Sequence, residues 1–580
     1  MKNQLFELLE LYEKELDYYN KKNRFYIFLR TILFVLFIVL IIAGMKIPAI
    51  SSYFMILFFI LILTFIIVCM NHYKIKLKKV NKELSLQVID EYFQRIDGKW
   101  HDFKDIGEDF INDSYILSDL DIVGVNSLFQ YLNIGKSEGG RKRLLERLSN
   151  KKLESLLDDQ EAVKELKDKL DFSIQFQVMS KSIKGNLTKI VEQLNCRTKD
   201  HKVILIINSL FSILTISLGV MSIFDIIDNA FFTLSALLQL SYSLIIDKIY
   251  EKEFDIIKST CSSFSSIYLV FKMIDKQTYI SHKMNIIQDS IKKGISIIQE
   301  LYKIDDLQTF RNHFLGYVIA NALFPLNSYL LYRFHKITTQ SFFDLKTSII
   351  NFEDLESLIS LSVLGVCKNN VSMPILSDCI ELEFKDIKHP LLKEDDCISN
   401  DFCCIDDINI VTGSNMSGKT SFMRTIGMNM ILMNAGGYVN ASLFKCPYLK
   451  IFTSMRVNDD IEEGISTFYG ELLRIKDIIE YKNTNLPFIV FIDEIFKGTN
   501  YNDRIFGAKE VISRISMNHS ILFISTHDFE LCDINNKKIK NYYFEEYYEN
   551  NQIKFDYKIK KGKCKTTNAR FLMKQLGILE

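Results

Sequence analysis

Residues 413–420 read Gly413-Ser414-Asn415-Met416-Ser417-Gly418-Lys419-Thr420, and this octapeptide decides the fold of the C-terminal part of the chain. It fits the pattern G-x-x-x-x-G-K-[ST] at every defined position. A mostly apolar run, 408–412, precedes it, and a stretch of helical character, 421–434, follows it. The alternative is a Gly-rich turn between a strand and a helix that binds no ligand. The strand–loop–helix context is what a phosphate-binding loop requires, so the sequence predicts an α/β nucleotide-binding domain.

The residue types of this loop suit a nucleoside triphosphate. The glycines let the backbone wrap around the phosphates, and the start of the helix adds N–H donors without intrahelical partners. Lys419 would reach the terminal phosphates, and the Thr420 hydroxyl would ligate Mg²⁺. We therefore expect ATP and Mg²⁺ as cofactors, bound by Gly413, Ser414, Asn415, Met416, Ser417, Gly418, Lys419, Thr420 and Ser421.

Two downstream strands end in residues suited to hydrolysis. The run 487–492 is wholly apolar, as a central parallel strand should be, and Asp493 and Glu494 follow it. Asp493 can hold Mg²⁺ through water, and Glu494 can orient and polarise the attacking water. A second strand, 520–525, leads to His527, which is a structural residue or, at this sheet edge, a γ-phosphate sensor. We predict Lys419, Glu494 and His527 as catalytic residues, and Thr420 and Asp493 as metal ligands.

Further segments accompany these residues in a fixed order. They are 421–425 (Ser-Phe-Met-Arg-Thr), 437–441 (Gly-Tyr-Val-Asn-Ala), 493–499 (Asp-Glu-Ile-Phe-Lys-Gly-Thr), 526–531 (Thr-His-Asp-Phe-Glu-Leu), 555–559 (Phe-Asp-Tyr-Lys-Ile) and 567–570 (Thr-Asn-Ala-Arg). Together with the octapeptide, this series resembles the ATPase domain of the MutS family. The sequence has no Leu-Ser-Gly-Gly-Gln stretch, which disfavours a transporter-type ABC cassette.

The resemblance also implies how the site is completed. Residues 464–468 (Gly-Ile-Ser-Thr-Phe) are similar to the signature segment of the family. In the family this segment reaches across a dimer to the nucleotide of the other subunit, which implies a homodimer in which Ser466 binds the nucleotide in trans. The implied fold is an α/β P-loop ATPase domain of the ABC and MutS type with an all-α lever domain.

The lever is indicated by segments before the ATPase domain. Residues 118–122, 127–133, 139–145 and 159–166 resemble the start of the MutS core, and 352–358 resemble its return to the ATPase domain. Arg141, Lys142 and Arg143 are either phosphate contacts or, more often for such a run, a solvated helix face. His389-Pro390 resembles the family's His-Pro element. Adenine is expected near the turn 400–402, where Phe402 is either a stacking residue or a core aromatic.

Composition limits the remaining function classes. Lysine and arginine number 71 against 71 acidic residues in 580, so no global basic field indicates nucleic acid. The 11 cysteines form no C-x-x-C pair, which favours core thiols in a reducing, cytosolic location for most of the chain.

Two long apolar runs near the N-terminus predict a transmembrane hairpin. Residues 1–24 read as a charged amphipathic helix, 25–44 are apolar except for Arg30 and a threonine, and 53–70 are apolar apart from Thr64. Each run can cross a hydrocarbon layer about 30 Å thick. Lysine and arginine flank the pair on both outer sides, against Lys46 alone in the connection, which places both ends in the cytoplasm. The alternative is a pair of buried core helices.

A second hairpin repeats this arrangement. Residues 203–224 and 230–246 are mostly apolar, with Asn208 and Gln239 as polar exceptions, and an acidic turn, 225–229, joins them. Flanking basic residues again predict cytoplasmic ends. Because the second run is near the short limit for a span, an intramembrane or dimer-interface hairpin stays open. A fifth apolar stretch, 314–332, holds Asn321, Pro325 and Asn327, and we expect it to be buried in protein.

The expected organisation is an amphipathic helix (1–24), hairpin 1 (25–70), the first part of the MutS-core-like domain (71–202), hairpin 2 (203–246), the helical lever (247–370) and the ATPase domain (371–580). The mismatch-reading and connector domains of mismatch-repair MutS do not fit the first 95 residues, so membrane helices are expected in their place. No nuclease-like extension is expected after Glu580.

Three functions compete at this point. The first is an ATPase anchored in the cell membrane, with the ATPase domain and both termini cytoplasmic, that moves its lever on ATP turnover and still engages DNA. The second is an ATP-driven membrane-remodelling or signalling machine with an unidentified protein partner and no DNA ligand. The third, a transporter, is disfavoured because four spans with few polar groups offer no evident pathway.

Overall fold

The structure is a computed structural model of the 580-residue chain. It describes residues 2–46, 51–110, 114–149, 155–181, 183, 186–194, 201–414, 416–456, 467–515, 519–549 and 552–564. The chain divides into two compact units, of which the first comprises residues 1–100 and 170–178 and the second comprises 101–169 and 179–580. Each unit is described by itself.

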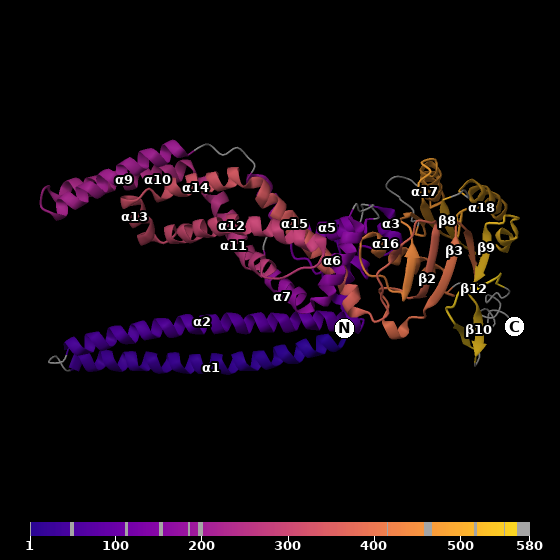
Figure 1. Ribbon diagram of the computed structural model, residues 1–580, viewed down its shortest axis with the longest axis horizontal. Coiled ribbons are helices and arrows are strands. Elements are labelled where there is room, and N and C mark those ends of the chain that lie inside the picture. Colours follow the sequence, from indigo (N-terminus) through magenta and orange to yellow (C-terminus); the bar gives the residue numbers. More distant parts are fainter. Residues whose placement is uncertain are drawn as a thin grey trace. The chain divides into compact units, whose positions relative to one another are not determined.

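The first unit is a long antiparallel helical hairpin with a short third helix. Its two long helices, α1 (Lys2–Lys46) and α2 (Ser51–Ile96), pack along each other, as Figure 1 shows in indigo and violet. Residues of α7 (Leu170–Ser180) pack near the N-terminal end of α1 and the C-terminal end of α2. There, Gln177 donates to the Tyr92 hydroxyl at 2.9 Å, and Tyr12 bonds Asp171. This end of the hairpin therefore has a polar, hydrogen-bonded seam.

The predicted boundaries inside this hairpin are not helix ends. Helix α1 runs without a break through residue 24, and α2 continues past residue 70 to Ile96. No proline interrupts either run, and residues 74–96 are rich in Lys, Glu and Leu, which favour helix. Arg30 bonds His72 across the hairpin at 3.0 Å between its guanidinium and Nδ1, so this charge has a neighbour on the other helix.

The helical part of the second unit contains the remaining helices before the sheets. They are α3 (Tyr115–Asp119), α4 (Leu128–Leu132), α5 (Glu138–Leu148), α6 (Leu156–Asp168), α8 (Leu187–Leu194), α9 (Lys202–Ile223), α10 (Asn229–Ile249), α11 (Glu251–Asp275), α12 (His282–Arg311), α13 (Phe314–Leu323), α14 (Leu326–Gln340) and α15 (Phe342–Cys367). Short 3₁₀ turns, η2 (Trp100–Asp102) and η3 (Glu108–Phe110), precede α3.

Helix α15 is the central element of this helical part. It contacts α5, α6, α8 and α12, and nearly every residue from 352 to 367 is buried. Its Glu356 accepts from the Ser137 hydroxyl, the N-cap of α5, and from the main-chain N–H of Lys136 at 3.0 Å. Buried Arg147 bonds Asp159 at 2.9 Å and Asp354 at 2.7 Å. These contacts hold α5 and α6 against α15, the last helix before the sheets.

On the face of α5 that holds residues 141–143, Lys142 is exposed and the two arginines form partly exposed ion pairs, which fits the solvated-face interpretation. Arg141 bonds Asp105 at 2.7 Å, and Arg143 bonds Glu146 at 2.9 Å.

The C-terminal part is an α/β domain with two sheets. The larger sheet has the order β12-β9-β4-β8-β7-β6, and all its strands are parallel except β12. Its strands are β4 (Ile408–Thr412), β6 (Lys450–Ser454), β7 (Phe488–Asp493), β8 (Ser520–Thr526), β9 (Ile539–Tyr543) and β12 (Lys560–Lys561). The smaller sheet, β1-β5-β2-β3, contains β1 (Ile375–Leu376), β2 (Glu381–Ile387), β3 (Asn400–Ile405) and β5 (Leu443–Cys446). A separate hairpin consists of β10 (Glu546–Glu549) and β11 (Gln552–Phe555).

The two faces of the larger sheet are covered differently. Alternate residues such as Val490 and Ile492 pack against α17 (Thr467–Lys482) and α18 (Tyr501–Ile515). The intervening residues Phe491 and Phe523 stack on each other, and Phe523 meets Phe422 of α16 (Lys419–Asn434) and Phe402 of β3. Such alternation is what a sheet buried on both faces needs. The 3₁₀ turns η4 (Glu394–Asp396) and η5 (Phe529–Asp533) complete the domain.

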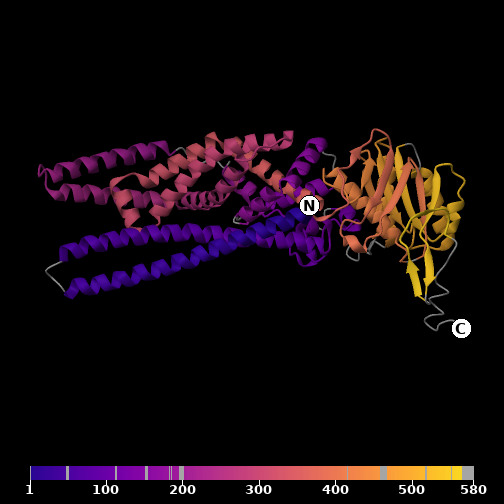
Figure 2. The same cartoon turned by 60° about the horizontal axis from the view of Figure 1, so that its bottom comes forward.

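Within the described part of the chain, four helices are long and apolar enough to cross a membrane by length and composition. They are α1, α2, α9 and α10, and each keeps most of its apolar window on the surface. Figure 2 shows α9 and α10 side by side from a second direction. The acidic turn between them leaves Ile226 exposed.

The expectation that residues 314–332 are buried in protein is wrong for their outer side. They form α13 and the start of α14, two helices that meet at 87° around Pro325. Asn321 and Asn327 are buried, but Phe314, Leu315 and Phe324 are exposed. Proline breaks the helix because it lacks the N–H and clashes with the preceding turn. The exposed side chains result from this break, since α13 contributes only one face to the bundle.

Candidate active site

Sheet order brings the predicted site residues to one edge. Strand β4 lies next to β8, and β8 lies next to β7, all parallel. Thr412 stands opposite Thr526, and Asp493 stands opposite Ser525. The loop after β4, the acidic pair after β7 and His527 after β8 therefore leave the sheet at the same, C-terminal edge, where ligands bind in open α/β sheets.

The loop between β4 and α16 has a backbone that only glycine allows at two positions. Gly413 has φ +151°, and a Cβ there would lie 2.8 Å from Ser417 Oγ and 2.9 Å from the Phe544 carbonyl oxygen. Gly418 has φ +108° at the start of α16. Met416, with φ +69°, has a side chain that is 87 % exposed. Asn415 lies outside the described residues.

Lys419 is held inside this loop. Its Nζ donates to the main-chain carbonyls of Gly413 at 2.8 Å and Ser414 at 3.0 Å, and the residue is only 5 % exposed. Burial lowers the pKa of this ammonium. His527 Nε2 lies 3.4 Å from the same Nζ. A lysine that bonds carbonyl oxygens at this place can exchange them for phosphate oxygens without moving its backbone.

Thr420 and Asp493 form an oxygen-donor pair of the kind that Mg²⁺ prefers. The Thr420 hydroxyl donates to Asp493 Oδ2 at 2.7 Å, and the Ser525 hydroxyl donates to Oδ1 of the same carboxylate. Among the described residues, Ser417 Oγ finds no hydrogen-bond partner, so the loop contains a buried hydroxyl without a hydrogen bond. Mg²⁺ is usually held by one or two protein oxygens with phosphate and water completing its shell, and these residues fit that requirement.

Glu494 and His527 are in hydrogen-bond contact beside this donor set. Glu494 Oε1 lies 3.2 Å from His527 Nε2, and Oε2 lies 2.8 Å from Lys497 Nζ. The His527 hydrogen bond, followed by Lys497, lowers the pKa of Glu494 to about 2. Its main-chain N–H donates to the Ser525 carbonyl at 3.1 Å, although its φ of +57° is unfavourable for a non-glycine residue. Glu494 is therefore an ionised carboxylate held in one place.

The loop after β7 is also bonded by a buried glutamate, Glu471, which the sequence did not single out. Glu471 Oε1 in α17 accepts from the main-chain N–H of Phe496 at 3.2 Å, and Phe496 has φ +60°. Desolvation raises the pKa of Glu471 to about 7. The Phe468 and Phe496 rings meet at 5.8 Å. The sequence did hold a signal for Glu471. It comes three residues after Phe468, so the two side chains lie on the same face of the helix.

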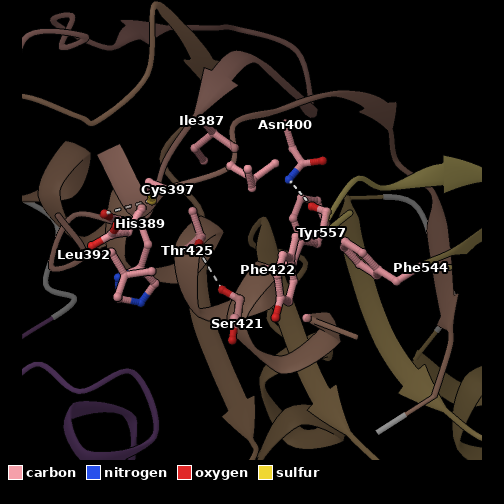
Figure 3. Close-up of a pocket in the computed structure, with 13 residues that line it drawn as sticks. Ile387, His389, Leu392, Cys397, Asn400, Ser421, Phe422, Thr425, Phe544 and Tyr557 are labelled. Atoms are coloured by element: carbon pink, nitrogen blue, oxygen red, sulfur yellow. Dashed lines mark hydrogen bonds between the residues drawn. The ribbon is translucent and has the colours of Figure 1, made fainter. Parts of the chain in front are cut away.

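A cavity opens beside the loop on the side of the smaller sheet. Its volume is about 340 Å³, and Figure 3 shows its lining. Gly418, Ser421 and Phe422 form the wall next to the loop, and the rest includes His389, Asn400 and Tyr557. Asn400 Nδ2 donates to the Tyr557 carbonyl at 3.0 Å, and its Oδ1 accepts from Ile559 N–H at 2.9 Å, which ties the Tyr557 segment to β3.

The two candidate positions for an aromatic stacking partner differ in exposure. Phe402 is buried in the aromatic cluster of Phe384, Phe422 and Phe523, so it is a core residue. Tyr557 is 46 % exposed and lines the cavity, and its ring lies 3.1 Å from where a Gly418 Cβ would stand. His389 is half-buried, and desolvation lowers its pKa to about 4, so it is neutral at pH 7.

The remaining predicted residues are placed less centrally. Ser421 is exposed and lines the cavity, and its carbonyl accepts from the Thr425 hydroxyl at 2.7 Å. The Ser414 hydroxyl bonds Glu546, a partner that the sequence gave no reason to expect. Ser466 and residues 567–570 lie outside the described residues. The segment 555–559 is not one strand, because β11 ends at Phe555 and β12 begins at Lys560.

Comparison with known proteins agrees with the sequence resemblance. Residues 409–570 match the sequence profile of MutS domain V. The DNA mismatch repair protein MutS of Fusobacterium nucleatum is 30 % identical over 261 residues, which cover 43 % of this chain and 28 % of that protein. The proteins of the same name from Aquifex pyrophilus and Macrococcus caseolyticus are 28 % identical over 235 residues and 32 % identical over 201 residues, covering 39 % and 33 % of this chain. This chain spans 23–28 % of the length of these three relatives.

Proposed function

Because the chain belongs to the MutS family through its C-terminal domain, we propose that it binds and hydrolyses ATP and uses the energy to move its helical lever. One observation carries this proposal: Lys419, the Thr420–Asp493 pair and the Glu494–His527 pair meet at one sheet edge. The helical part and the α/β domain are the two parts such a coupling needs.

Each residue has a role that its contacts support. Lys419 would exchange its two carbonyl partners for phosphate oxygens. Thr420 and Asp493 would hold Mg²⁺, which, when bound, neutralises charge on the phosphates. Glu494, ionised at neutral pH because its pKa is about 2, accepts a hydrogen bond from the attacking water and orients it. His527 fixes the Glu494 carboxylate and lies close enough to Lys419 to contact the same phosphate.

The cavity beside the loop is the proposed base-binding site. It adjoins Gly418 at the start of α16, and Tyr557 offers an exposed ring face for stacking. Because Asn400 holds the Tyr557 backbone, loss of either residue should weaken nucleotide binding more than turnover.

A second protomer would complete each site. Residues 464–466 directly precede α17, the helix whose Glu471 supports the Glu494 loop. We expect Ser466 of the second protomer to bind the γ-phosphate, so that the dimer closes with ATP and opens after hydrolysis.

The coupling to the lever would run through α3. Asp119 is fully buried and accepts from the main-chain N–H groups of Met455 and Arg456 at 3.0 and 3.2 Å and from the Arg474 guanidinium at 2.7 Å. Arg474 lies on α17, one turn beyond Glu471. The same helix thus contacts the catalytic loop and the first helices of the lever, so a displacement of α17 would reach both.

We further propose that the chain is anchored in the cell membrane by α1–α2 and α9–α10, with the ATPase domain and both termini in the cytoplasm. The exposed apolar windows of these four helices and the basic residues that flank them support this location. The lipid bilayer is then a partner, and lever movement would act on helices held in it.

The decisive experiment measures ATP turnover by the purified full chain in detergent, alone and with duplex, mismatched and branched DNA. Turnover that Glu494→Gln abolishes, while nucleotide binding persists, supports the ATPase. Stimulation by DNA that weakens with salt favours DNA engagement. Turnover unaffected by any DNA favours the second function, an ATP-driven membrane-remodelling or signalling machine with an unidentified protein partner. Absence of nucleotide binding by the unmodified protein would contradict both.

A further inference from the structure

The bundle of α9, α10, α13 and α14 has its polar side chains inside. Asn208 Nδ2 donates to Ser328 Oγ at 2.8 Å, and Gln239 Nε2 donates to Ser212 Oγ at 2.5 Å. The hydroxyls of Thr215 and Ser235 lie 2.7 Å apart. All six residues are buried. Side-chain hydrogen bonds between helices are a common contact where the surroundings are apolar.

The outside of the same bundle is apolar. Exposed large side chains on α9 and α10 include Ile206, Leu210, Ile213, Leu214, Phe231, Leu234, Leu237 and Leu238. Helix α13 continues this surface with Phe314, Leu315 and Ile319, of which the first two are 80 % and 71 % exposed. No charged residue occurs between residues 314 and 332. A polar inside with an apolar outside is the reverse of a water-soluble bundle, and it fits hydrocarbon as the surrounding medium.

Helix α13 cannot itself cross the bilayer. Its ten residues reach about 15 Å, which is half of the hydrocarbon thickness. It meets α14 at 87°, and Figure 1 shows it lying across the end of α12 and not along α9 and α10. Its inner side is made of Gly316, Ala320 and Asn321. Gly316 lets it fold back closely, because a Cβ there would lie 2.4 Å from the Phe310 carbonyl oxygen.

Charged and polar contacts fix the position of α13 along the α9–α10 hairpin. Arg311, at the end of α12, pairs with Asp247 near the C-terminal end of α10, and its Nε donates to Asn327 Oδ1 at 2.8 Å. Asn327 Nδ2 in turn donates to the Ser243 carbonyl at 3.1 Å. The start of α13 is therefore held beside the last turns of α10, the end that the flanking basic residues place on the cytoplasmic side.

We propose that α13 is an interfacial membrane helix that lies in the plane of the cytoplasmic leaflet, with Phe314, Leu315 and Ile319 among the lipid acyl chains near the headgroups. This inference rests on the proposed membrane anchoring and adds to it a fifth lipid contact where α12 joins the bundle. Helices of this kind place one apolar face at the boundary of headgroups and acyl chains. The occupant of the exposed face is phospholipid, because that face carries no charged residue and lies beside the apolar surface of α9 and α10.

Depth-dependent fluorescence quenching tests the inference. The chain has one tryptophan, Trp100, which is buried in the first unit and supplies a constant background. Three variants of the full chain, Leu315→Trp, Ile213→Trp and Ile286→Trp, are reconstituted in phosphatidylcholine vesicles. The lipids carry bromine at carbons 6,7 or 11,12 of one acyl chain, with unbrominated vesicles as reference. All three replaced residues are exposed.

We expect Leu315→Trp to lose fluorescence mostly to the shallow bromines and Ile213→Trp, midway along α9, mostly to the deep ones. Ile286→Trp, at the far end of α12, should lose none. Phe314→Trp serves as a second reporter, and ATP turnover checks that each variant is folded.

Three outcomes overturn the inference in different ways. Quenching of Ile213→Trp but not of Leu315→Trp or Phe314→Trp means that protein or water covers α13, while the membrane anchor stands. Stronger quenching of Leu315→Trp by the deep bromines means a re-entrant segment in place of an interfacial one. No quenching at either position contradicts the membrane anchor, and the inference with it.

Discussion

At the scale of single residues, the two carboxylates at the end of β7, Asp493 and Glu494, have different kinds of contacts. Asp493 accepts two hydroxyl hydrogen bonds, from Thr420 and Ser525, while Glu494 contacts the His527 imidazole and the Lys497 ammonium. The hydroxyl contacts suit a metal ligand, which must keep its lone pairs in a fixed direction. The contacts with His527 and Lys497 lower the pKa of Glu494, which suits a carboxylate that must stay ionised while it orients water.

Replacement of Glu494 by glutamine tests this division of roles. We expect Glu494→Gln to bind ATP as the unmodified protein does but to lose turnover by about 10²–10⁴-fold, the usual contribution of a positioned acid–base group. Single-turnover hydrolysis and equilibrium nucleotide binding measure the two effects. Glu510→Gln, an exposed glutamate of α18, is the matched control and should keep full turnover. Equal loss of binding and turnover in Glu494→Gln would contradict the assigned role.

Glu471 gives a pH dependence whose sign can be worked out. Its pKa is about 7 in the folded chain and about 4.3 when unfolded, so the folded state holds the proton more tightly between these values. Stability from this group is therefore present at low pH and is lost as pH rises from about 4.3 towards 7.

The Glu471→Gln variant lacks this titration but keeps an acceptor for the Phe496 N–H. We expect its melting temperature, measured without nucleotide, to rise relative to that of the unmodified protein as pH increases from 5 to 7, and then to stay level. A difference that does not change with pH would show that Glu471 is not protonated in this range.

At the scale of elements, α17 connects three parts of the molecule. Its first turn follows residues 464–466, its middle supports the catalytic loop through Glu471, and Arg474 bonds Asp119 of α3. The Arg474 guanidinium also lies 4.6 Å from the Tyr115 ring centroid. Beside this contact, a Cβ on Gly427 of α16 would lie 2.6 Å from the Leu120 side chain, so the lever start packs directly on the domain.

Removal of the Asp119 carboxylate should separate these elements. Asp119→Ala leaves two main-chain N–H groups and a buried guanidinium unpaired, and loss of one partner of a buried ion pair costs about 3–5 kcal/mol. We expect a lower melting temperature and, in preparations that remain folded, ATP turnover that no longer responds to whichever ligand stimulates the unmodified protein. Asp109→Ala, which removes a mostly exposed carboxylate, should change neither. An unchanged melting temperature in Asp119→Ala would refute the buried contact.

At the scale of the whole molecule, a shared site predicts complementation between inactive chains. Lys419→Ala damages a protomer's own loop, whereas Ser466→Ala damages the site of the other protomer. Each variant alone should be inactive. When the two are mixed and allowed to exchange, half of the dimers are mixed and each has one intact site, so about a quarter of normal turnover should return. A mixture of Lys419→Ala and Glu494→Gln, which both damage their own protomer's site, is the control and should stay inactive. Failure of the first mixture to recover, with exchange verified, would exclude the shared site.

The local pattern of the chain was enough to place the strands that lead to the candidate site residues. The run 408–412 is β4, the apolar run before Asp493 is β7, and the strand before Thr526 is β8, because buried parallel strands are short and uniformly apolar. The octapeptide has the glycines that its backbone requires, and the match to MutS domain V confirms the family resemblance. The four apolar runs do lie in helices, although α1 and α2 extend well beyond the first two runs.

Only the tertiary structure decided what these elements contact. Strand order and helix packing bring together residues that are far apart in sequence. These long-range contacts give Glu494 and Glu471 their hydrogen-bond partners, bury Phe402 in the core and surround the Asp119 carboxylate with donors. The error over residues 314–332 has the same origin: hydropathy measures how apolar a segment is, but which of its faces is covered depends on neighbours that the segment itself does not specify.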